Sequence, residues 1–299
     1  MRIKESELIL NPDSSIYHLN LKPDDIAETI ITVGDQNRVD QIANYFDEVS
    51  FETQKREFKT KVGYYNGKKL MVISTGIGTD NIDIVLNELD ALANIDFQSR
   101  TIKEEKKQLQ FIRIGTSGSL QEDIPVDSFL ASTAGVGFDG LLHYYAHDHV
   151  INIATTSALI QHLNDSPKKA EPYVVDASQV LIDKFKKTNQ TALHFGLTGT
   201  NIGFYGPQGR VLRLPLSKPN FVDSLASFNY QNQRITNLEM ETSAIYALSK
   251  LLGHQALSVN AIIANRANGT FSQNPKETIG KLIQFVLQTL TTENEVCKP

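Results

Sequence analysis

Two segments of the chain place an apolar, strand-like run directly before a glycine turn and an apolar helical period. Residues 29–46 begin with TIITV, turn at Gly34, and continue with apolar side chains at helical spacing. Residues 69–92 repeat this order, with Gly76 and Gly78 in the turn. Short apolar runs are typical of buried strands, and apolar residues three or four positions apart are typical of helices. This alternation predicts an α/β architecture.

The rest of the chain favours one domain of the same kind. Apolar runs predict further strands at 111–120, 128–136, 192–200 and 256–264. Apolar spacing predicts helices at 38–46, 80–92, 243–252 and 275–290. No linker rich in proline, glycine or serine interrupts this order, so we expect residues 1–299 to form a single three-layer α/β/α domain around a mixed sheet. We expect the polar stretch 94–110 to be a solvated connection or helix face, and 164–172 to be a surface loop.

Charge and cysteine content exclude several classes of partner and site. The chain has 29 basic and 34 acidic residues, and this net charge of −5 does not favour nucleic acid or an anionic membrane surface. The only cysteine, Cys297, excludes an intrachain disulfide and a thiolate metal cluster. The N-terminus lacks a signal-peptide core, and no run approaches a membrane span. We expect a cytoplasmic protein whose partners are small molecules and further copies of itself.

Three arginines and a threonine are candidates for an oxyanion site. Arg113 interrupts the apolar run FIRIG, and a guanidinium in a buried strand is costly unless it meets an anion or a carboxylate. Arg38 follows a Gly-Asp turn, Arg56 lies in KREF, and Thr116 adds a hydroxyl donor. Guanidinium groups bind oxyanions with pairs of N–H donors. The alternative is a structural ion pair for Arg113 and exposed charge for Arg38 and Arg56.

The segment FYGPQGR (204–210) is a candidate for recognition of a base. The Gln208 amide both donates and accepts hydrogen bonds, and Arg210 donates only. Together they can match the acceptor, donor, acceptor edge of uracil, and Phe204 can stack on the ring. The alternative is a Gly-Pro turn with exposed polar residues.

Two other features each allow two interpretations. The turn TGIGTDN (75–81) partly matches a dinucleotide-binding fingerprint, but Asn81 replaces the third glycine, so a tight strand-to-helix turn explains it as well. Glu239 and Glu241 precede the predicted helix 243–252. They form either a solvated helix start or one wall of a polar pocket.

Taken in order, these motifs resemble the nucleoside phosphorylase family. The matching segments are YHLNL (17–21), VGDQNRV (33–39), REF (56–58), STGIG (74–78), RIGTSGS (113–119), FYGPQGR (204–210), LEMET (238–242) and NR (265–266). They run through nearly the whole chain. The combination of QGR with NR is similar to the pyrimidine-specific branch, which cleaves uridine.

The resemblance implies a nucleoside phosphorylase-like fold and a phosphate-dependent pentosyl transfer. Uridine, with deoxyuridine or thymidine as further substrates, would yield uracil and ribose 1-phosphate in pyrimidine salvage. Inorganic phosphate would be a co-substrate, with no organic cofactor and no catalytic metal. The implied alternatives are a purine nucleoside phosphorylase or nucleosidase, and a catalytically silent nucleoside-binding protein on the same scaffold.

The resemblance also implies a role for each matching residue. The phosphate-binding residues would be Gly34, Arg38, Arg56, Arg113 and Thr116. The ribose-binding residues would be His18, Met240 and Glu241. The base-binding residues would be Phe204, Gln208, Arg210, Glu239 and Arg266. Arg38, Arg113, Glu241 and Arg210 would be the catalytic groups, and Arg266 stands where purine-specific relatives have an acid.

The family further implies a homo-oligomer, either a dimer or a hexamer built from dimers. His18 in the N-terminal extension (1–25) and Arg56 would serve a neighbouring subunit's site, and a monovalent cation can lie at such an interface. The chain departs from the family in its loops: GDQNR replaces GDPxR, and GIGTDN replaces GIGGPS and introduces Asp80. It also carries extra residues near 99–110 and 164–175.

Overall fold

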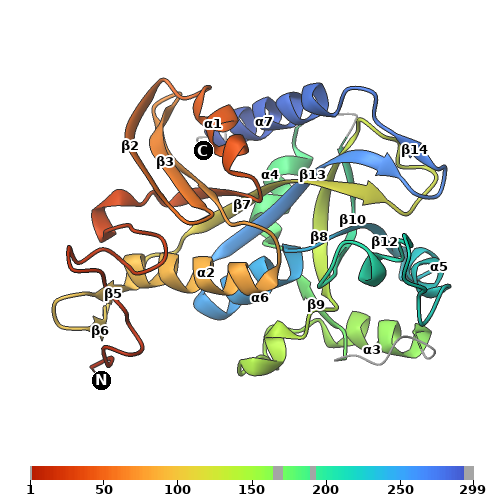
Figure 1. Cartoon of the computed structure of the whole chain (residues 1–299), viewed down its shortest axis with the longest axis horizontal. Helices are drawn as coiled ribbons and strands as arrows, with labels where there is room; N and C mark the ends of the chain where they lie inside the picture. Colours follow the sequence, from red (N-terminus) through yellow and green to blue (C-terminus); the bar gives the residue numbers. More distant parts are fainter. Residues whose placement is uncertain (1, 164–170, 189–192, 293–299) are drawn as a thin grey trace, which may run out of the picture.

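A large mixed sheet organises the computed structural model, which describes residues 2–163, 171–188 and 193–292. Its strand order is β11-β12-β10-β8-β13-β7-β1-β4-β3-β2, with β9 beside β8 and β14 beside β13 (Figure 1). The strands are β1 (Thr29–Val33), β2 (Glu48–Lys55), β3 (Phe58–Tyr65), β4 (Lys68–Ser74), β7 (Gln110–Ser119), β8 (Phe129–Gly137), β9 (Tyr173–Asp176), β10 (Leu193–Thr200), β11 (Asn229–Tyr230), β12 (Gln233–Glu239), β13 (Gln255–Asn265) and β14 (Thr270–Phe271). β5 (Ile95–Asp96) and β6 (Thr101–Ile102) form a separate hairpin.

Five strands of this sheet close on themselves. β7, β13, β8, β10 and β12 are neighbours in that order, and β12 returns to pair with β7. The closing pairs are Asn237 with Ser119 and Leu238 with Gly118. This closure sets the end of β12, where the LEMET segment begins, beside the end of β7. Arg113 and Thr116 lie earlier in the same strand, and Arg113 is level with Thr32 near the end of β1.

Helices cover both faces of the sheet, as Figure 1 shows for α1 and α7 on one side and α2 and α6 on the other. The helices are α1 (Gln36–Ala43), α2 (Thr79–Asn94), α3 (Ile153–His162), α4 (Gln179–Lys186), α5 (Phe221–Ala226), α6 (Thr242–Leu252) and α7 (Pro275–Thr291), with short 3₁₀ turns at Pro23–Asp25, Leu141–Tyr144 and Gly206–Gln208. One apolar core lies under α2 and α6, and a second lies under α1, α4 and α7. The predicted α/β class with helices on both faces of a mixed sheet is confirmed.

Most of the predicted elements are present, and the differences have physical causes. The four predicted helices correspond to α1, α2, α6 and α7. The β2–β3 hairpin was not predicted, because β2 lies at the edge of the sheet and its second half alternates exposed polar residues with partly buried ones, without an apolar run. Exposed charged residues such as Glu48 and Glu52 protect an edge strand from pairing with other chains.

The structure describes the polar stretch 94–110 in full and the predicted surface loop 164–172 only in part. Residues 94–110 form a connection that contains the β5–β6 hairpin rather than a helix face. Residues 164–170 of the predicted surface loop, and Cys297, lie outside the described residues. Among the described residues, no helix has the length and apolar character needed to span a membrane.

The close packing of α6 on β8 depends on a glycine. A Cβ atom at Gly135 would lie 2.7 Å from the Ser243 Cα atom and 2.9 Å from its backbone nitrogen. These neighbours are backbone atoms of the first turn of α6, so they cannot rotate away as a side chain can. We predict that Gly135→Ala lowers the free energy of unfolding by about 1–3 kcal/mol, measured by urea denaturation.

Gly280 provides the matched control for this prediction. It lies within α7, and a Cβ atom there meets nothing within 4 Å. Since alanine is favoured over glycine inside helices, Gly280→Ala should raise the free energy of unfolding by about 0.5–1 kcal/mol. Equal effects of the two substitutions would contradict the packing argument.

Candidate active site

A cavity of about 310 Å³ collects most of the residues predicted from the sequence. Its lining includes Gly34, Arg38, Arg113, Thr116, Phe204, Gln208, Arg210, Glu239, Met240 and Glu241. These residues come from the ends of β1 and β12, the middle of β7, the start of α1 and the loop after β10. Ligands of open α/β sheets bind at the carboxyl ends of parallel strands, where glycine turns and helix N-termini meet.

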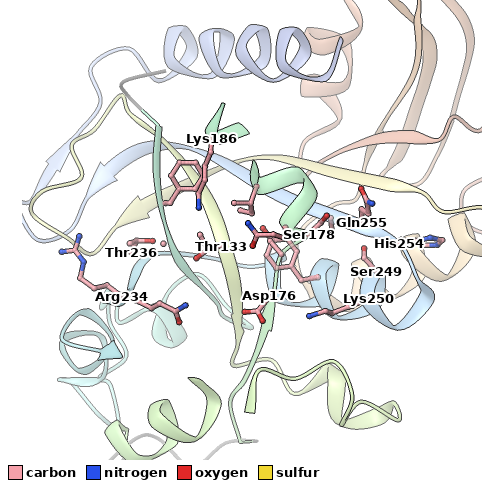
Figure 2. Close-up of a pocket in the computed structure, with 18 of the residues that line it drawn as sticks. Thr133, Asp176, Ser178, Lys186, Arg234, Thr236, Ser249, Lys250, His254 and Gln255 are labelled. Atoms are coloured by element: carbon pink, nitrogen blue, oxygen red, sulfur yellow. The ribbon is translucent and has the colours of Figure 1, made fainter. Parts of the chain in front are cut away.

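A larger cavity, of about 750 Å³, lies elsewhere in the molecule (Figure 2). It runs between α4, the end of α6 and the start of β12, with Ser178, Lys250 and Arg234 among the described residues in its wall. None of the predicted site residues lines it. Size alone therefore does not identify the active site, and the smaller cavity carries the predicted chemistry.

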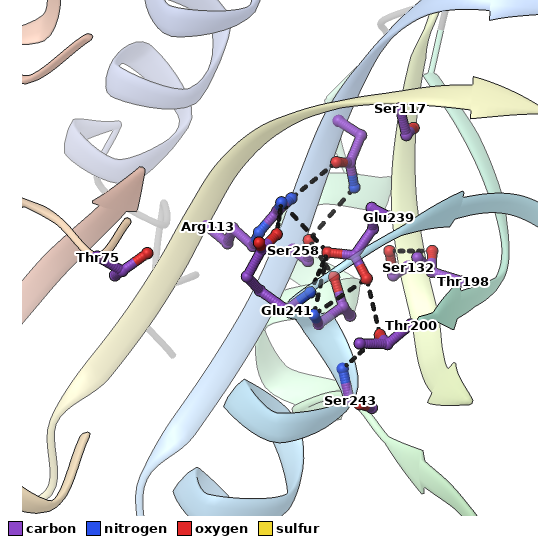
Figure 3. A network of polar contacts seen from close by, with 12 residues as sticks. Thr75, Arg113, Ser117, Ser132, Thr198, Thr200, Glu239, Glu241, Ser243 and Ser258 are labelled. Carbon is purple, nitrogen blue, oxygen red and sulfur yellow. Dashed lines mark hydrogen bonds and ion pairs between the residues drawn. The ribbon is translucent and has the colours of Figure 1, made fainter. Parts of the chain in front are cut away.

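Arg113 is held at the base of the smaller cavity by three side chains (Figure 3). Its Nη1 donates to the Asn260 Oδ1 atom at 2.8 Å. Its Nη2 donates to Glu241 and lies 3.2 Å from the Glu239 Oε2 atom. Burial alone would lower the pKa of the Arg113 guanidinium, but Glu239 and Glu241 raise it above its ordinary value. The structural ion pair, which was the alternative interpretation of Arg113, is thus present, and its residues line the cavity.

Glu241 links three parts of the site. It lies between the end of β12 and the start of α6, and its side chain lines the cavity. Its Oε1 atom accepts the Gly78 N–H at 2.9 Å, and its other oxygen accepts from Arg113. Burial raises the pKa of Glu241, Arg113 opposes this effect, and the charge of Glu239 adds to it. Of the two open interpretations of the glutamates, the structure supports the pocket wall.

Arg38 has fewer partners than Arg113. It lies in the first turn of α1, whose N-cap Asp35 accepts the Asn37 N–H. Its Nη1 donates weakly to the Ile114 carbonyl oxygen at 3.4 Å, and its buried Nε has no hydrogen-bond partner among the described residues. Burial and the nearby charge of Arg113 both lower the pKa of Arg38. A desolvated guanidinium with a vacant donor, at the edge of a cavity, favours an anionic ligand.

The loop after β10 places a glutamine and an arginine together. Arg210 Nη1 donates to the Gln208 Oε1 atom and to the Phe204 carbonyl oxygen, both at 2.7 Å. The Arg210 guanidinium also lies 3.8 Å from the centre of the Phe204 ring. The Gln208 oxygen accepts from Arg210, so the hydrogen-bond donors of this side chain are its amide N–H groups.

Arg266 lies behind this loop rather than in the cavity wall. Its Nη1 donates to the Gln208 carbonyl oxygen at 2.5 Å, and its backbone N–H donates to the Ser119 carbonyl oxygen. Burial lowers the pKa of the Arg266 guanidinium. Arg266 therefore holds the backbone at Gln208 in place. Gln208 lines the cavity, and Arg266 does not.

His18 and Arg56 also lie outside this cavity, and they lie together. His18 Nδ1 is 2.6 Å from the Glu88 Oε1 atom, and its ring packs edge-on against Tyr17. The Arg56 guanidinium lies 6.0 Å from the centre of the same Tyr17 ring. The two residues predicted to serve a neighbouring subunit thus share one patch of surface.

Sequence inspection missed Asn260 and Gly115 beside Arg113. Asn260 accepts from Arg113, and a Cβ atom at Gly115 would lie 1.8 Å from the Arg113 Nη1 atom. Both residues stand in apolar strand sequences, as Arg113 does. A polar or absent side chain in a buried run was the signal that could have identified them.

Comparison with known proteins agrees with this geometry. Residues 28–291 match the model of the phosphorylase superfamily. A uridine phosphorylase of Haemophilus influenzae is 30% identical over 288 residues, covering 92% of this chain and 96% of the relative. A uridine phosphorylase of Thermococcus kodakarensis is 29% identical over 263 residues, covering 86% of this chain and 80% of the relative.

A solved structure is similar over almost the full length. The nucleoside phosphorylase of Trypanosoma brucei, described as showing uridine phosphorylase activity, superposes with a TM-score of 0.86 at 29% identity and covers 96% of this chain and 100% of its own. The match to the family model includes every residue that lines the 310 Å³ cavity. The chain therefore belongs to the phosphorylase superfamily, and it is an enzyme of the pentosyltransferase class.

Proposed function

We propose that the chain is a uridine phosphorylase, which cleaves uridine with inorganic phosphate and forms uracil and ribose 1-phosphate. The observation that carries this proposal is the buried, partly unpartnered guanidinium of Arg38 near Arg113, in a cavity that Gln208 and Arg210 also line. A site for an oxyanion and a site for a uracil edge in one cavity match the two substrates. Deoxyuridine and thymidine are further substrates of the same chemistry.

In the reaction, one bond forms and one bond breaks at C1′ of the sugar. A phosphate oxygen attacks C1′, the bond from C1′ to N1 of uracil breaks, and its electron pair leaves with the base. Gly34, Arg38, Arg113 and Thr116 bind the phosphate, whose negative charge stabilises the cationic sugar. Met240 and Glu241 hold the ribose. Positioning two bound reactants in this way lowers the barrier without a protein nucleophile.

The base end stabilises the departing uracil. Negative charge develops on the uracil carbonyl oxygens as the bond breaks, and donors aimed at them favour the transition state over the substrate. The donors available are the Gln208 amide and the Arg210 guanidinium, with Phe204 against the ring. Arg266, in place of an acid, cannot protonate a purine leaving group, which favours pyrimidines.

We further propose a cytoplasmic homo-oligomer, a dimer or a hexamer of dimers, formed by single-domain subunits that share active sites. His18 and Arg56 lie outside the cavity of their own chain and beside each other, as residues that serve a neighbour's site should. No cofactor beyond phosphate is needed for the proposed chemistry. A monovalent cation at the subunit interface is compatible with it.

One substrate panel tests the proposal. Uridine, deoxyuridine, thymidine, cytidine, inosine and adenosine are incubated with and without phosphate, and ribose 1-phosphate or its deoxy form is measured. We expect phosphate-dependent cleavage of uridine, and cytidine turnover at least about 100-fold lower, because the cytosine amino group cannot accept from Arg210. Arg38→Gln should lower kcat/KM for phosphate by about 10²–10³.

Three results would point to the alternatives. Equal turnover without phosphate indicates a nucleosidase. Preference for inosine or adenosine indicates a purine nucleoside phosphorylase. Uridine binding in calorimetry without any turnover indicates a silent binding protein.

Glu241→Gln should separate activity from stability. Because burial raises the pKa of Glu241 above its ordinary value of 4.5, the folded state binds this proton more tightly than the unfolded chain. The residue's contribution to stability is therefore present at low pH and lost as the pH rises through the folded-state pKa.

The neutral glutamine removes this cost while Glu239 remains to balance Arg113. We expect the free energy of unfolding at neutral pH to stay within about 1 kcal/mol of wild type or to rise, while turnover falls by about 10²–10³. Denaturation at several pH values and initial rates measure the two effects. A less stable but active variant would show that Glu241 serves only the helix start.

Shared sites predict recovery of activity in mixed oligomers. Arg56→Gln removes a residue that serves the active site of the neighbouring subunit. Glu241→Gln removes a residue that serves the active site of its own chain. Co-expressed and purified together, each hybrid pair has one complete site, so activity should recover to roughly a quarter of wild type in a random two-fold assembly.

A mixture of Arg38→Gln and Glu241→Gln is the matched control, because both residues line the cavity of one chain. This mixture should stay inactive. Absence of recovery in the first mixture, or an active monomer, would contradict shared sites.

A further inference from the structure

Among the described residues that line the cavity, Glu239 has the carboxylate that accepts the most hydrogen bonds. Its Oε1 atom accepts the Thr200 hydroxyl at 2.7 Å and the Thr242 N–H at 3.1 Å. Its Oε2 atom accepts the N–H groups of Glu241 and Thr242, both at 3.0 Å, and lies 3.2 Å from Arg113 Nη2. Its side chain is 2% exposed. These contacts, drawn in Figure 3, leave little capacity for a base.

Glu239, rather than the N-cap residue Glu241, accepts a hydrogen bond from the first amide of α6. Glu241 is the N-cap residue of α6, yet its side chain accepts from no amide of that helix among the described residues. An N-cap side chain normally accepts from the first free amides of the helix. Here Glu239, two residues earlier, accepts from the Thr242 amide, and this leaves the Glu241 carboxylate to point across the cavity toward Gly78 and Arg113.

Thr200 extends this arrangement to the neighbouring strand β10, where it is paired in register with Glu239. Its hydroxyl donates to Glu239 and accepts the Ser243 N–H at 2.9 Å. The end of β10, the start of α6 and the guanidinium of Arg113 are thus tied to a single carboxylate. Moving that carboxylate would move Met240 and Glu241, which we assign to the ribose, and Arg113, which we assign to phosphate.

We propose that Glu239 is a positioning residue for the sugar phosphate end of the site and makes no contact with the base. This role rests on the proposed function. It replaces base binding as the role of Glu239. Its effect passes through the backbone of Met240 and Glu241 and through Arg113.

The test compares affinities for the two products of the reaction. In Glu239→Gln, one acceptor oxygen becomes an N–H₂ donor that faces either the α6 amides or the Arg113 donors. We expect kcat to fall by about 10- to 100-fold and the affinity for ribose 1-phosphate to fall by about tenfold, as for lost hydrogen bonds to a charged group. The affinity for uracil should stay within about twofold. Calorimetry with uracil and with ribose 1-phosphate as separate probes, and initial rates with uridine, give the three values.

Two further variants separate positioning from folding. Thr200→Val removes one donor to Glu239 and keeps its charge, so it should change the same values in the same direction by a smaller factor; it also carries the test if Glu239→Gln fails to fold. Ser132→Ala is the control. Its buried hydroxyl lies in the same barrel, the closed ring formed by β7, β13, β8, β10 and β12, but it bonds to Thr198 and not to Glu239. It should lower the melting temperature and leave both affinities unchanged.

Two results would overturn the proposal. A loss of uracil affinity as large as, or larger than, the loss of ribose 1-phosphate affinity would show that the effect of Glu239 is not confined to the sugar phosphate end. A lower melting temperature with unchanged affinities and kcat would make it purely structural. Wild-type turnover judges the proposed function separately: an active wild type with an unaffected Glu239→Gln rejects only this inference, whereas a wild type inert toward every nucleoside of the panel rejects both.

Discussion

The contact between Arg113 and two glutamates is the interaction on which the cavity depends. A guanidinium inside a strand would be too costly to bury alone, and two adjacent carboxylates would repel each other without it. Arg113 stabilises both carboxylates and they offset the cost of burying it, while the two carboxylates still repel each other. The group carries one surplus negative charge when both glutamates are ionised, so Arg38 rather than Arg113 supplies positive charge to the cavity.

The same group joins segments that are far apart in the sequence. Arg113 comes from β7, the glutamates from the junction of β12 and α6, Gly78 from the turn before α2, and Asn260 from β13. The glycines next to it are required by space: Gly115 leaves room for the Arg113 side chain, and Gly135 lets α6 approach β8 closely enough to direct Glu241 inward. Chemistry and packing thus restrict the same few positions.

Part of this arrangement could be predicted from the sequence. Strand and helix periods identified α1, α2, α6 and α7, because each has a distinct apolar face. Arg113 and the FYGPQGR segment were recognisable because polar residues interrupt apolar runs or follow a turn. The division of work between Glu239 and Glu241 was not predictable, since it depends on which carboxylate reaches the free amides of α6. The placement of Arg266 behind Gln208 likewise depends on a contact between distant residues.

Closure of the five-stranded ring also has a consequence for how the chain acquires its site. The two pairs that join β12 to β7 connect residues more than a hundred positions apart, and such long-range contacts tend to form late in folding. Until they form, Arg113 lacks its two carboxylates and the cavity has no second wall. A partly folded chain would therefore offer no phosphate or nucleoside site, and ligands would stabilise only the finished barrel. In cells, substrate supply would then act on the survival of the enzyme as well as on its rate.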